Sequence, residues 1–127
     1  MAREGSAYHL VITDAADGAP LGSAGLELHD RPAVHGELGY WVAAPARGRG
    51  AATRAVRLLS DWALGSLALP LLEIHVLPGN AASRAVARKT GFTRVGERLL
   101  PFRGRIEDFH VYALNATGAA RSDRPGV

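Results

Sequence analysis

The chain has 127 residues, of which 47% are hydrophobic and 21% are charged. This length supports one domain with a single core and leaves no room for a second regulatory module. Fifteen Lys and Arg against 12 Asp and Glu give a net charge of +3. An excess this small favours an anionic small molecule as ligand over a long nucleic acid. With no cysteine in the chain, disulfides, thiolate metal sites and a cysteine nucleophile are excluded.

The sequence shows no feature of secretion, membrane insertion or metal binding. Residues 1–6 lack the apolar stretch of a secretory signal, and no apolar run approaches the roughly 20 residues that cross a bilayer. The spacing of His, Glu and Asp does not indicate a metal site. We therefore expect a cytoplasmic protein with no membrane partner and no metal.

The first third of the chain predicts strands. Residues 8–13 alternate between apolar and polar side chains and are rich in residues that favour strands. A cluster of turn residues at 14–20 separates them from a second alternating stretch at 21–28. This pattern is typical of a hairpin. Residues 37–42 predict a third strand, which Pro45 ends.

An amphipathic helix is predicted next, ending at Gly65. Its buried face is expected to carry Ala52, Ala55, Val56, Leu59, Trp62 and Ala63, and its polar face Arg54, Arg57, Ser60 and Asp61.

The remaining elements alternate between strand and helix. A strand is predicted at 71–77 and a helix at 81–90, with Asn80 as its N-cap and Gly91 as its stop. Two final strands are predicted at 95–100 and 106–114.

The resulting order, ββ-β-α-β-α-ββ, predicts the α+β class: a mixed, mostly antiparallel sheet flanked by helices. Residues 1–115 are expected to form one domain, and residues 116–127 a disordered tail.

The segment between the third strand and the first helix has the composition of a phosphate site. It reads Arg47-Gly48-Arg49-Gly50-Ala51-Ala52-Thr53. A helix N-terminus binds anions through its free N–H groups, glycine permits close approach, and arginine adds charge-assisted bonds. The alternative is an ordinary strand–helix turn whose arginines serve solubility.

Two nucleotide-binding motifs match this segment less well. A Walker loop requires a lysine that the segment lacks. Gly48-x-Gly50-x-x-Thr53 matches half of the dinucleotide fingerprint, with Glu73 near the distance of a ribose contact. However, Thr53 replaces the third glycine or alanine, and Glu73 lies at the start of its strand.

A second segment makes the pattern specific. Asn80-Ala-Ala-Ser83 followed by Lys89-Thr90-Gly91-Phe92, together with Arg47-x-x-Gly50-x-Ala52, resembles the acyl-CoA signature of the GNAT superfamily of N-acetyltransferases. Gly-Tyr-Trp-Val at 39–42 further resembles the branch that acetylates the N-terminal alanine of ribosomal proteins and various small amines. The resemblance extends from about Tyr8 to Leu114.

This resemblance implies the acyl-CoA N-acyltransferase fold and transfer of acetyl from acetyl-CoA to a primary amine, either a protein N-terminus or a small molecule, by direct attack in a ternary complex. In that family the amides of residues 48–53 would hold the pyrophosphate. Backbone near Trp41 and Val42, splayed from the strand at 71–77, would pair with the pantetheine arm, and an amide near Val42 would polarise the thioester. Asn80 and Ser83 match positions that contact this arm, although helix capping and a solvated hydroxyl would explain them too.

Attack by an amine requires a base. Glu37, which opens the strand leading to the thioester, is the first candidate, and a solvated strand-end carboxylate is its alternative. His35 is second, as a loop residue, while His29, His75 and His110 are interpreted as sheet-face residues. The leaving thiolate would take its proton from water, from Ser83, or from Tyr40 or Tyr112.

One departure from the family pattern concerns the acceptor side. The family usually has a strand and two helices before the first hairpin, and this chain has residues 1–7 in their place. Three explanations stay open: a longer true protein, a homodimer partner that supplies the missing wall, or a CoA-binding remnant without catalysis. A nucleic-acid binder is disfavoured because no recognition-helix or aromatic RNA-binding pattern is present.

Overall fold

The computed structural model describes residues 6–31, 33–48 and 50–116. These residues contain six strands, two α-helices and a short 3₁₀ helix, in the predicted order. The strands are β1 (Ala7–Thr13), β2 (Pro20–His29), β3 (His35–Val42), β4 (Leu71–Val76), β5 (Thr93–Phe102) and β6 (Arg105–Asn115). The helices are η1 (Ala44–Ala46), α1 (Ala51–Gly65) and α2 (Ala81–Lys89). The expected tail lies outside the described residues, apart from Ala116.

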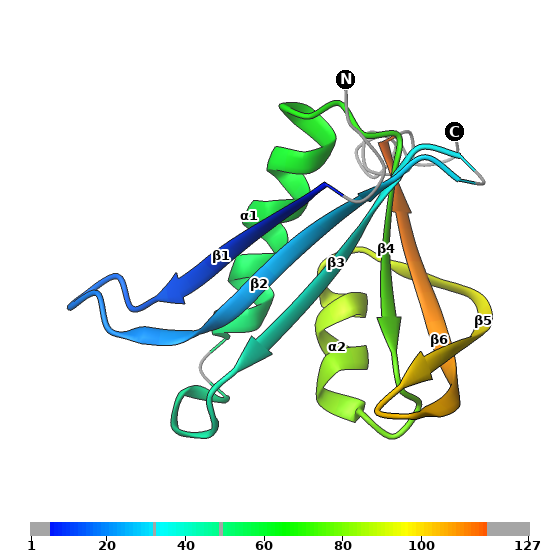
Figure 1. Cartoon of the computed structure of the whole chain (residues 1–127). Coiled ribbons are helices and arrows are strands. Elements are labelled where there is room, and N and C mark those ends of the chain that lie inside the picture. The colour runs from blue at the N-terminus through cyan, green and yellow to red at the C-terminus, as the bar shows by residue number, and fades with distance from the viewer. Residues whose placement is uncertain (1–5, 32, 49, 117–127) are drawn as a thin grey trace.

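The sheet is mixed, as predicted. Its strand order is β1-β2-β3-β4-β6-β5, and β3–β4 is the parallel pair among antiparallel neighbours (Figure 1). The hairpin between β5 and β6 turns at Arg103 and Gly104, which both have positive φ, at 52° and 78°. This is the backbone that a two-residue hairpin turn requires, and it lets both strands extend beyond the predicted bounds.

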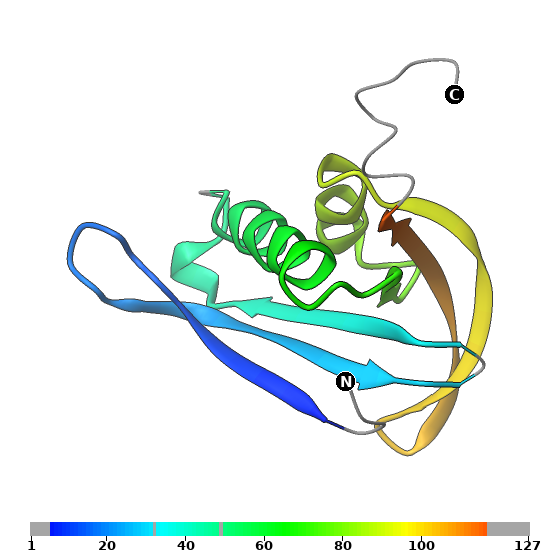
Figure 2. The ribbon, with the colours of Figure 1, turned by 90° about the horizontal axis from the view of Figure 1, so that it is seen from above.

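Both described α-helices pack on the same face of the sheet (Figure 2). The core lies between the helices and the sheet. The strands contribute alternate side chains, of which Leu26, Leu72 and Ile74 are fully buried, and α1 contributes Val56, which is also fully buried. The opposite face of the sheet, here called the open face, carries no helix within the described residues. The prediction of a sheet flanked by helices is thus confirmed with both helices on one side.

The buried face of α1 differs in part from the prediction. Ser60, expected on the polar face, is only 3% exposed, whereas Trp62, expected in the core, is 37% exposed. The buried set of Val56, Leu59, Ser60 and Ala63 still has helical spacing, but it is centred on small side chains that let α1 approach the sheet closely. Trp62 instead packs edge-on against Tyr8 of β1, with ring centroids 5.1 Å apart.

Two glycines of β3 provide a test of this packing. Replacing Gly36 by Ala is expected to lower the free energy of unfolding by about 1–3 kcal/mol, the usual cost of overpacking. A Cβ at Gly36 would lie 2.7 Å from a methyl carbon of Leu26 and 3.0 Å from those of Leu69 and Leu72. Gly39→Ala is the control because nothing lies within 4 Å of the corresponding Cβ. Urea unfolding that gives both variants the same stability would contradict this packing.

Candidate functional site

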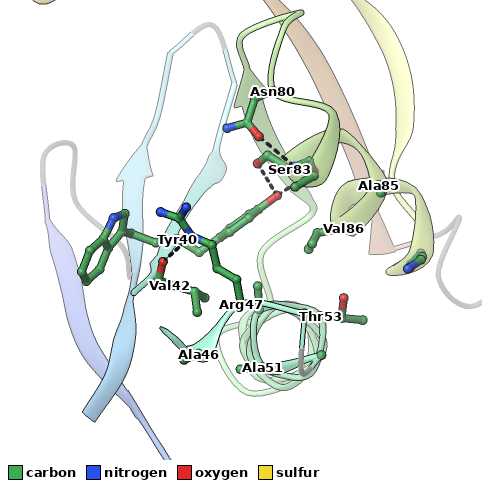
Figure 3. A pocket seen from close by; sticks show the side chains of 16 residues that line it. Tyr40, Val42, Ala46, Arg47, Ala51, Thr53, Asn80, Ser83, Ala85 and Val86 are labelled. Carbon is green, nitrogen blue, oxygen red and sulfur yellow. Dashed lines mark hydrogen bonds between the residues drawn. The ribbon is translucent and has the colours of Figure 1, made fainter. Parts of the chain in front are cut away.

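A cavity of about 520 Å³ opens where the end of β3 meets the N-termini of α1 and α2. Figure 3 shows the side chains around it. It is lined by Tyr40, Trp41, Val42, Ala46, Arg47, Gly48, Gly50, Ala51, Ala52, Thr53, Asn80, Ala82, Ser83, Ala85, Val86 and Lys89. Segments up to 49 residues apart in the chain therefore form one wall.

The cavity lies beside a split between two neighbouring strands. β3 and β4 pair only through Gly36–Leu72, Glu37–Glu73 and Leu38–Ile74, although both strands continue further. Figure 1 shows the strands parting beyond these pairs. From Gly39 to Val42, β3 bonds to β2 on one side, while its other edge faces the split. Backbone polar groups along that edge are available to an extended ligand.

The N-terminus of α1 has the backbone geometry of an anion site. Gly48 and the N-cap Gly50 adopt positive φ, at 80° and 76°. The first helical bond runs from Arg54 N to Gly50 O, so the amides of the first turn have no acceptor within the helix. No acidic residue occupies that turn, which leaves the positive end of the helix dipole unneutralised.

Arg47 is held at the cavity wall. Its Nε donates a hydrogen bond of 3.0 Å to the carbonyl oxygen of Val42, as Figure 3 shows. This bond connects the loop before α1 to the end of β3. Lys89, at the end of α2, adds a second cationic residue to the lining.

A hydrogen-bonded pair spans the cavity from β3 to α2. The Ser83 hydroxyl donates to the Tyr40 hydroxyl at 2.8 Å, and Tyr40 donates to the backbone oxygen of Ser83 at 2.9 Å (Figure 3). Burial raises the pKa of Tyr40 above 10.0, so this phenol stays protonated at neutral pH. Asn80 caps α2 by accepting from the Ser83 amide at 3.0 Å, as its N-cap position predicted.

The structure brings together ten of the eleven residues that the sequence selected for the cofactor. Arg49, the eleventh, lies outside the described residues. Five further lining residues were not selected because they carry no motif: Ala46 of η1, and Ala82, Ala85, Val86 and Lys89 of α2. Of the two candidate tyrosines, Tyr40 lines the cavity, whereas Tyr112 is 3% exposed and packs in the core.

Glu37 and Ser83, the two predicted catalytic residues, do not share this cavity. Ser83 lines it on the helix side, while Glu37 points to the open face, because its neighbour Leu38 faces the core. Glu37 belongs to the middle one of the three β3–β4 pairs, close to the point where the strands part. The two residues thus lie on opposite faces near the same split.

Three glutamates form a row across the open face, here called the glutamate row. Glu27 of β2 pairs with Glu37 of β3, which pairs with Glu73 of β4. His75 lies between two of them: its Nδ1 is 3.1 Å from Glu37 Oε2, and its Nε2 is 2.9 Å from Glu73 Oε1. Arg98 approaches Glu73 at 3.2 Å.

The histidines lie as the sequence predicted, with one correction. His29, His75 and His110 are all on the faces of the sheet, the first two on the open face and His110, which pairs with Val76, on the helix side. His35, interpreted as a loop residue, is the first residue of β3 and is 7% exposed. Its ring stacks on that of His29 with centroids 5.0 Å apart.

The contacts within the row shift the pKa values of its members. The adjacent His75 imidazole lowers the pKa of Glu37 below 4.5 despite partial burial. Burial would raise the pKa of Glu73, but His75 and Arg98 together lower it. Burial would likewise lower the pKa of His75, but Glu37 and Glu73 raise it above 6.5.

A gap in the side chains lies beside Glu37. Gly39 follows it on the same face and pairs with Gly25 of β2, so no side chain projects there from either strand. Nothing lies within 4 Å of the position that a Cβ on Gly39 would occupy. A small group could therefore reach the carboxylate of Glu37 from the open face.

The comparison with known families decides what this architecture belongs to. The sequence model described as "Acetyltransferase (GNAT) domain" matches residues 1–93. The chain belongs to the GNAT acetyltransferase family. In Bacillus subtilis (strain 168), the protein named "Probable N-acetyltransferase YjcK" is 34% identical over 110 residues, which are 84% of this chain and 61% of that protein. This GNAT chain therefore spans about three fifths of that relative's length.

Solved structures agree with this assignment. The ribosomal-protein-S5-alanine acetyltransferase from Vibrio fischeri is 25% identical, with a TM-score of 0.78 over 87% of this chain and 62% of its own. The spermidine/spermine N-acetyltransferase SpeG from Vibrio cholerae shares the fold, with a TM-score of 0.78 at 19% identity over 96% of this chain and 74% of its own. Within the described residues, no helix is both long and apolar enough to cross a membrane.

The glutamate row predicts a pH-dependent contribution of His75 to stability. Because the pKa of His75 is raised, its contribution to stability is fully present below pH 6.5 and is lost as pH rises through the raised pKa. Because the pKa values of Glu37 and Glu73 are lowered, their contribution is present above 4.5 and is lost as pH falls through the lowered values.

We therefore expect His75→Gln to destabilise the protein most between pH 4.5 and 6.5. The measurement is the free energy of unfolding of both proteins across that range and beyond it on either side. A difference in unfolding free energy that does not change with pH would contradict the proposed link between the charge of His75 and stability.

Proposed function

We propose that this GNAT chain transfers acetyl from acetyl-CoA to a primary amine, by direct attack in a ternary complex. The observation that carries the proposal is the cavity at the N-terminus of α1, which continues along the free edge of β3. The cavity suits the anionic end of an acyl-CoA, and the free strand edge suits its extended amide-containing arm. The family match supports the same chemistry.

The pyrophosphate is assigned to the first turn of α1. The amides of Ala51, Ala52 and Thr53 are free of helical bonds, and Gly48 and Gly50 keep their approach open. Arg47 lines the same cavity and would add a charge-assisted bond. Arg49 is proposed as a further contact on the basis of its place in the motif.

The pantetheine arm is assigned to the split. Trp41 and Val42 lie on the part of β3 beside the split and line the cavity, and an amide near Val42 would stabilise negative charge on the thioester oxygen. Asn80 and Ser83 stand across from this edge, at the N-terminus of α2.

Ser83 is proposed to protonate the leaving thiolate. When the C–S bond breaks, the thiolate sulfur takes the proton of the Ser83 hydroxyl. The 2.8 Å hydrogen bond then reverses, and Tyr40 turns from the Ser83 carbonyl oxygen to give its proton to the Ser83 side-chain oxygen. Tyr40 can do this because burial keeps its phenol protonated. A water molecule then returns the proton to Tyr40.

Glu37 and His75 are proposed to receive the proton of the attacking amine. The glutamate row attracts an ammonium group, and the gap at Gly39 lets that group reach Glu37 beside the split. The lowered pKa of Glu37 makes it a weak base by itself, whereas the raised pKa of His75, 3.1 Å away, suits a proton acceptor at neutral pH.

Arg47→Ala is expected to weaken acetyl-CoA binding by about 1–3 kcal/mol, the scale of a lost charge-assisted bond. Calorimetric titration measures it. Arg88→Ala is the matched control, because Arg88 is exposed on α2 and does not line the cavity. If both variants bind equally well, the pyrophosphate assignment is wrong.

Glu37→Gln is expected to reduce turnover about 10²–10⁴-fold while acetyl-CoA affinity is unchanged. The amide keeps the shape of the side chain but neither attracts the ammonium nor accepts its proton. Glu107→Gln, on β6 beside Arg105, is the control for loss of one carboxylate. Wild-type rates for Glu37→Gln between pH 6 and 9 would exclude this role.

The overall proposal is tested by release of free thiol from acetyl-CoA with a panel of amines, including peptides that begin with Ala or Ser. Turnover with any of them supports acetyl transfer. Retained acetyl-CoA binding without turnover would instead support a CoA-binding domain that lacks a complete acceptor site.

A further inference from the structure

Three metal-ligand donors converge on the open face. Glu27 and His29 lie two residues apart on β2, and Glu37 lies on β3 directly opposite Glu27. Nε2 of His29 is 3.3 Å from Oε1 of Glu27 and 3.3 Å from Oε1 of Glu37. All three donor atoms lie within 4.8 Å of one another. The sequence spacing concealed this arrangement because the third residue comes from the neighbouring strand.

The register places like charges side by side, which calls for a cation. Carboxylates directly opposite on paired strands repel each other, and Glu73 continues the row on β4. Arg98 contacts Glu73 at the far end of the row, and His75 lies between Glu73 and Glu37. His29 places a ring nitrogen within 3.3 Å of both Glu27 and Glu37.

We propose that Glu27, His29 and Glu37 form a binding site for a divalent transition-metal ion such as Zn²⁺. Tetrahedral zinc with bonds of about 2.0–2.1 Å holds its ligands about 3.3–3.4 Å apart. The two separations from His29 already have this value. Two carboxylates balance the charge of the ion, and one imidazole nitrogen adds affinity for transition metals over Mg²⁺ or Ca²⁺.

A buried side chain is aimed into the site from β4. The His75 side chain is 8% exposed, and its Nδ1 makes no hydrogen bond of good geometry to any described residue, although Glu37 Oε2 is 3.1 Å away. Its other nitrogen is fixed by Glu73. His75 is thus placed to orient the Glu37 carboxylate while the other oxygen of that carboxylate binds the ion. The ring of His35 stacks on the ring of His29 and so holds this ligand in position.

Occupancy would have a consequence for activity, and this part rests on the proposed function. An ion bound to Glu37 would cancel the charge that attracts the ammonium group. The metal would therefore inhibit acetyl transfer in competition with the amine, whereas acetyl-CoA would still bind at the distant end of the cavity.

The direct test is calorimetric titration of the whole metal-free chain with Zn²⁺ at pH 7.5, without acetyl-CoA. We expect one ion per chain, and a loss of affinity of at least about tenfold in His29→Gln and in Glu27→Gln. His110→Gln is the matched control, because His110 lies on the other face of the sheet. Thermal unfolding of each variant without metal verifies that it is folded, and the Glu27 side chain is 53% exposed, so its replacement disturbs little packing.

Absence of Zn²⁺ binding, or binding that His29→Gln and Glu27→Gln leave unchanged, would overturn the site. The binding result is independent of catalysis. If the chain binds Zn²⁺ at these residues but transfers no acetyl group to any amine without metal, the metal site stands and the proposed function fails. If acetyl transfer occurs and Zn²⁺ does not bind, the opposite holds.

Discussion

The feature on which the site depends is the early end of hydrogen bonding between β3 and β4. After three residue pairs the two strands separate, and beyond this point the side chain of Tyr40 on β3 reaches α2. Tyr40 bridges the space with two hydrogen bonds to Ser83. A free strand edge costs stability unless its polar groups find partners, so it points to a ligand with amide groups of its own.

The split also separates two regions of opposite electrostatic character. On the helix side, the unneutralised N-terminus of α1, Arg47 and Lys89 favour an anion. On the open face, the glutamate row favours a cation. The sheet between them opens where β3 and β4 part, close to Glu37 and Gly39. An anionic donor and a cationic acceptor could therefore approach from opposite faces and meet there.

The same row explains why the proposed catalytic and metal-binding properties involve shared residues. Glu37 is close to His29 on one side and to His75 on the other. A carboxylate held in this way can accept an ammonium group or a metal ion, and not both together. Competition between them follows directly from the cross-strand register.

Much of the fold was predictable from local sequence. Alternation of apolar and polar residues predicted the strands, and the helical spacing of apolar residues predicted α1. Asn80 predicted the start of α2. These signals are readable because capping and periodicity depend on near neighbours in the chain. The bounds of β5 and β6 were short because the positive φ of Arg103 was not foreseen. The position of Trp62 was wrong because apolarity alone does not tell which part of a helix the sheet covers.

For the site, the sequence by itself determined the glycine-rich start of α1 and the Asn80–Ser83 segment, because each is a short motif with its own backbone chemistry. Only the tertiary structure decided that Tyr40, and not Tyr112, meets Ser83, and that Glu37 lies on the face opposite the cavity. It alone aligned Glu27, Glu37 and Glu73 in one row, since strand register is set by pairing between distant segments.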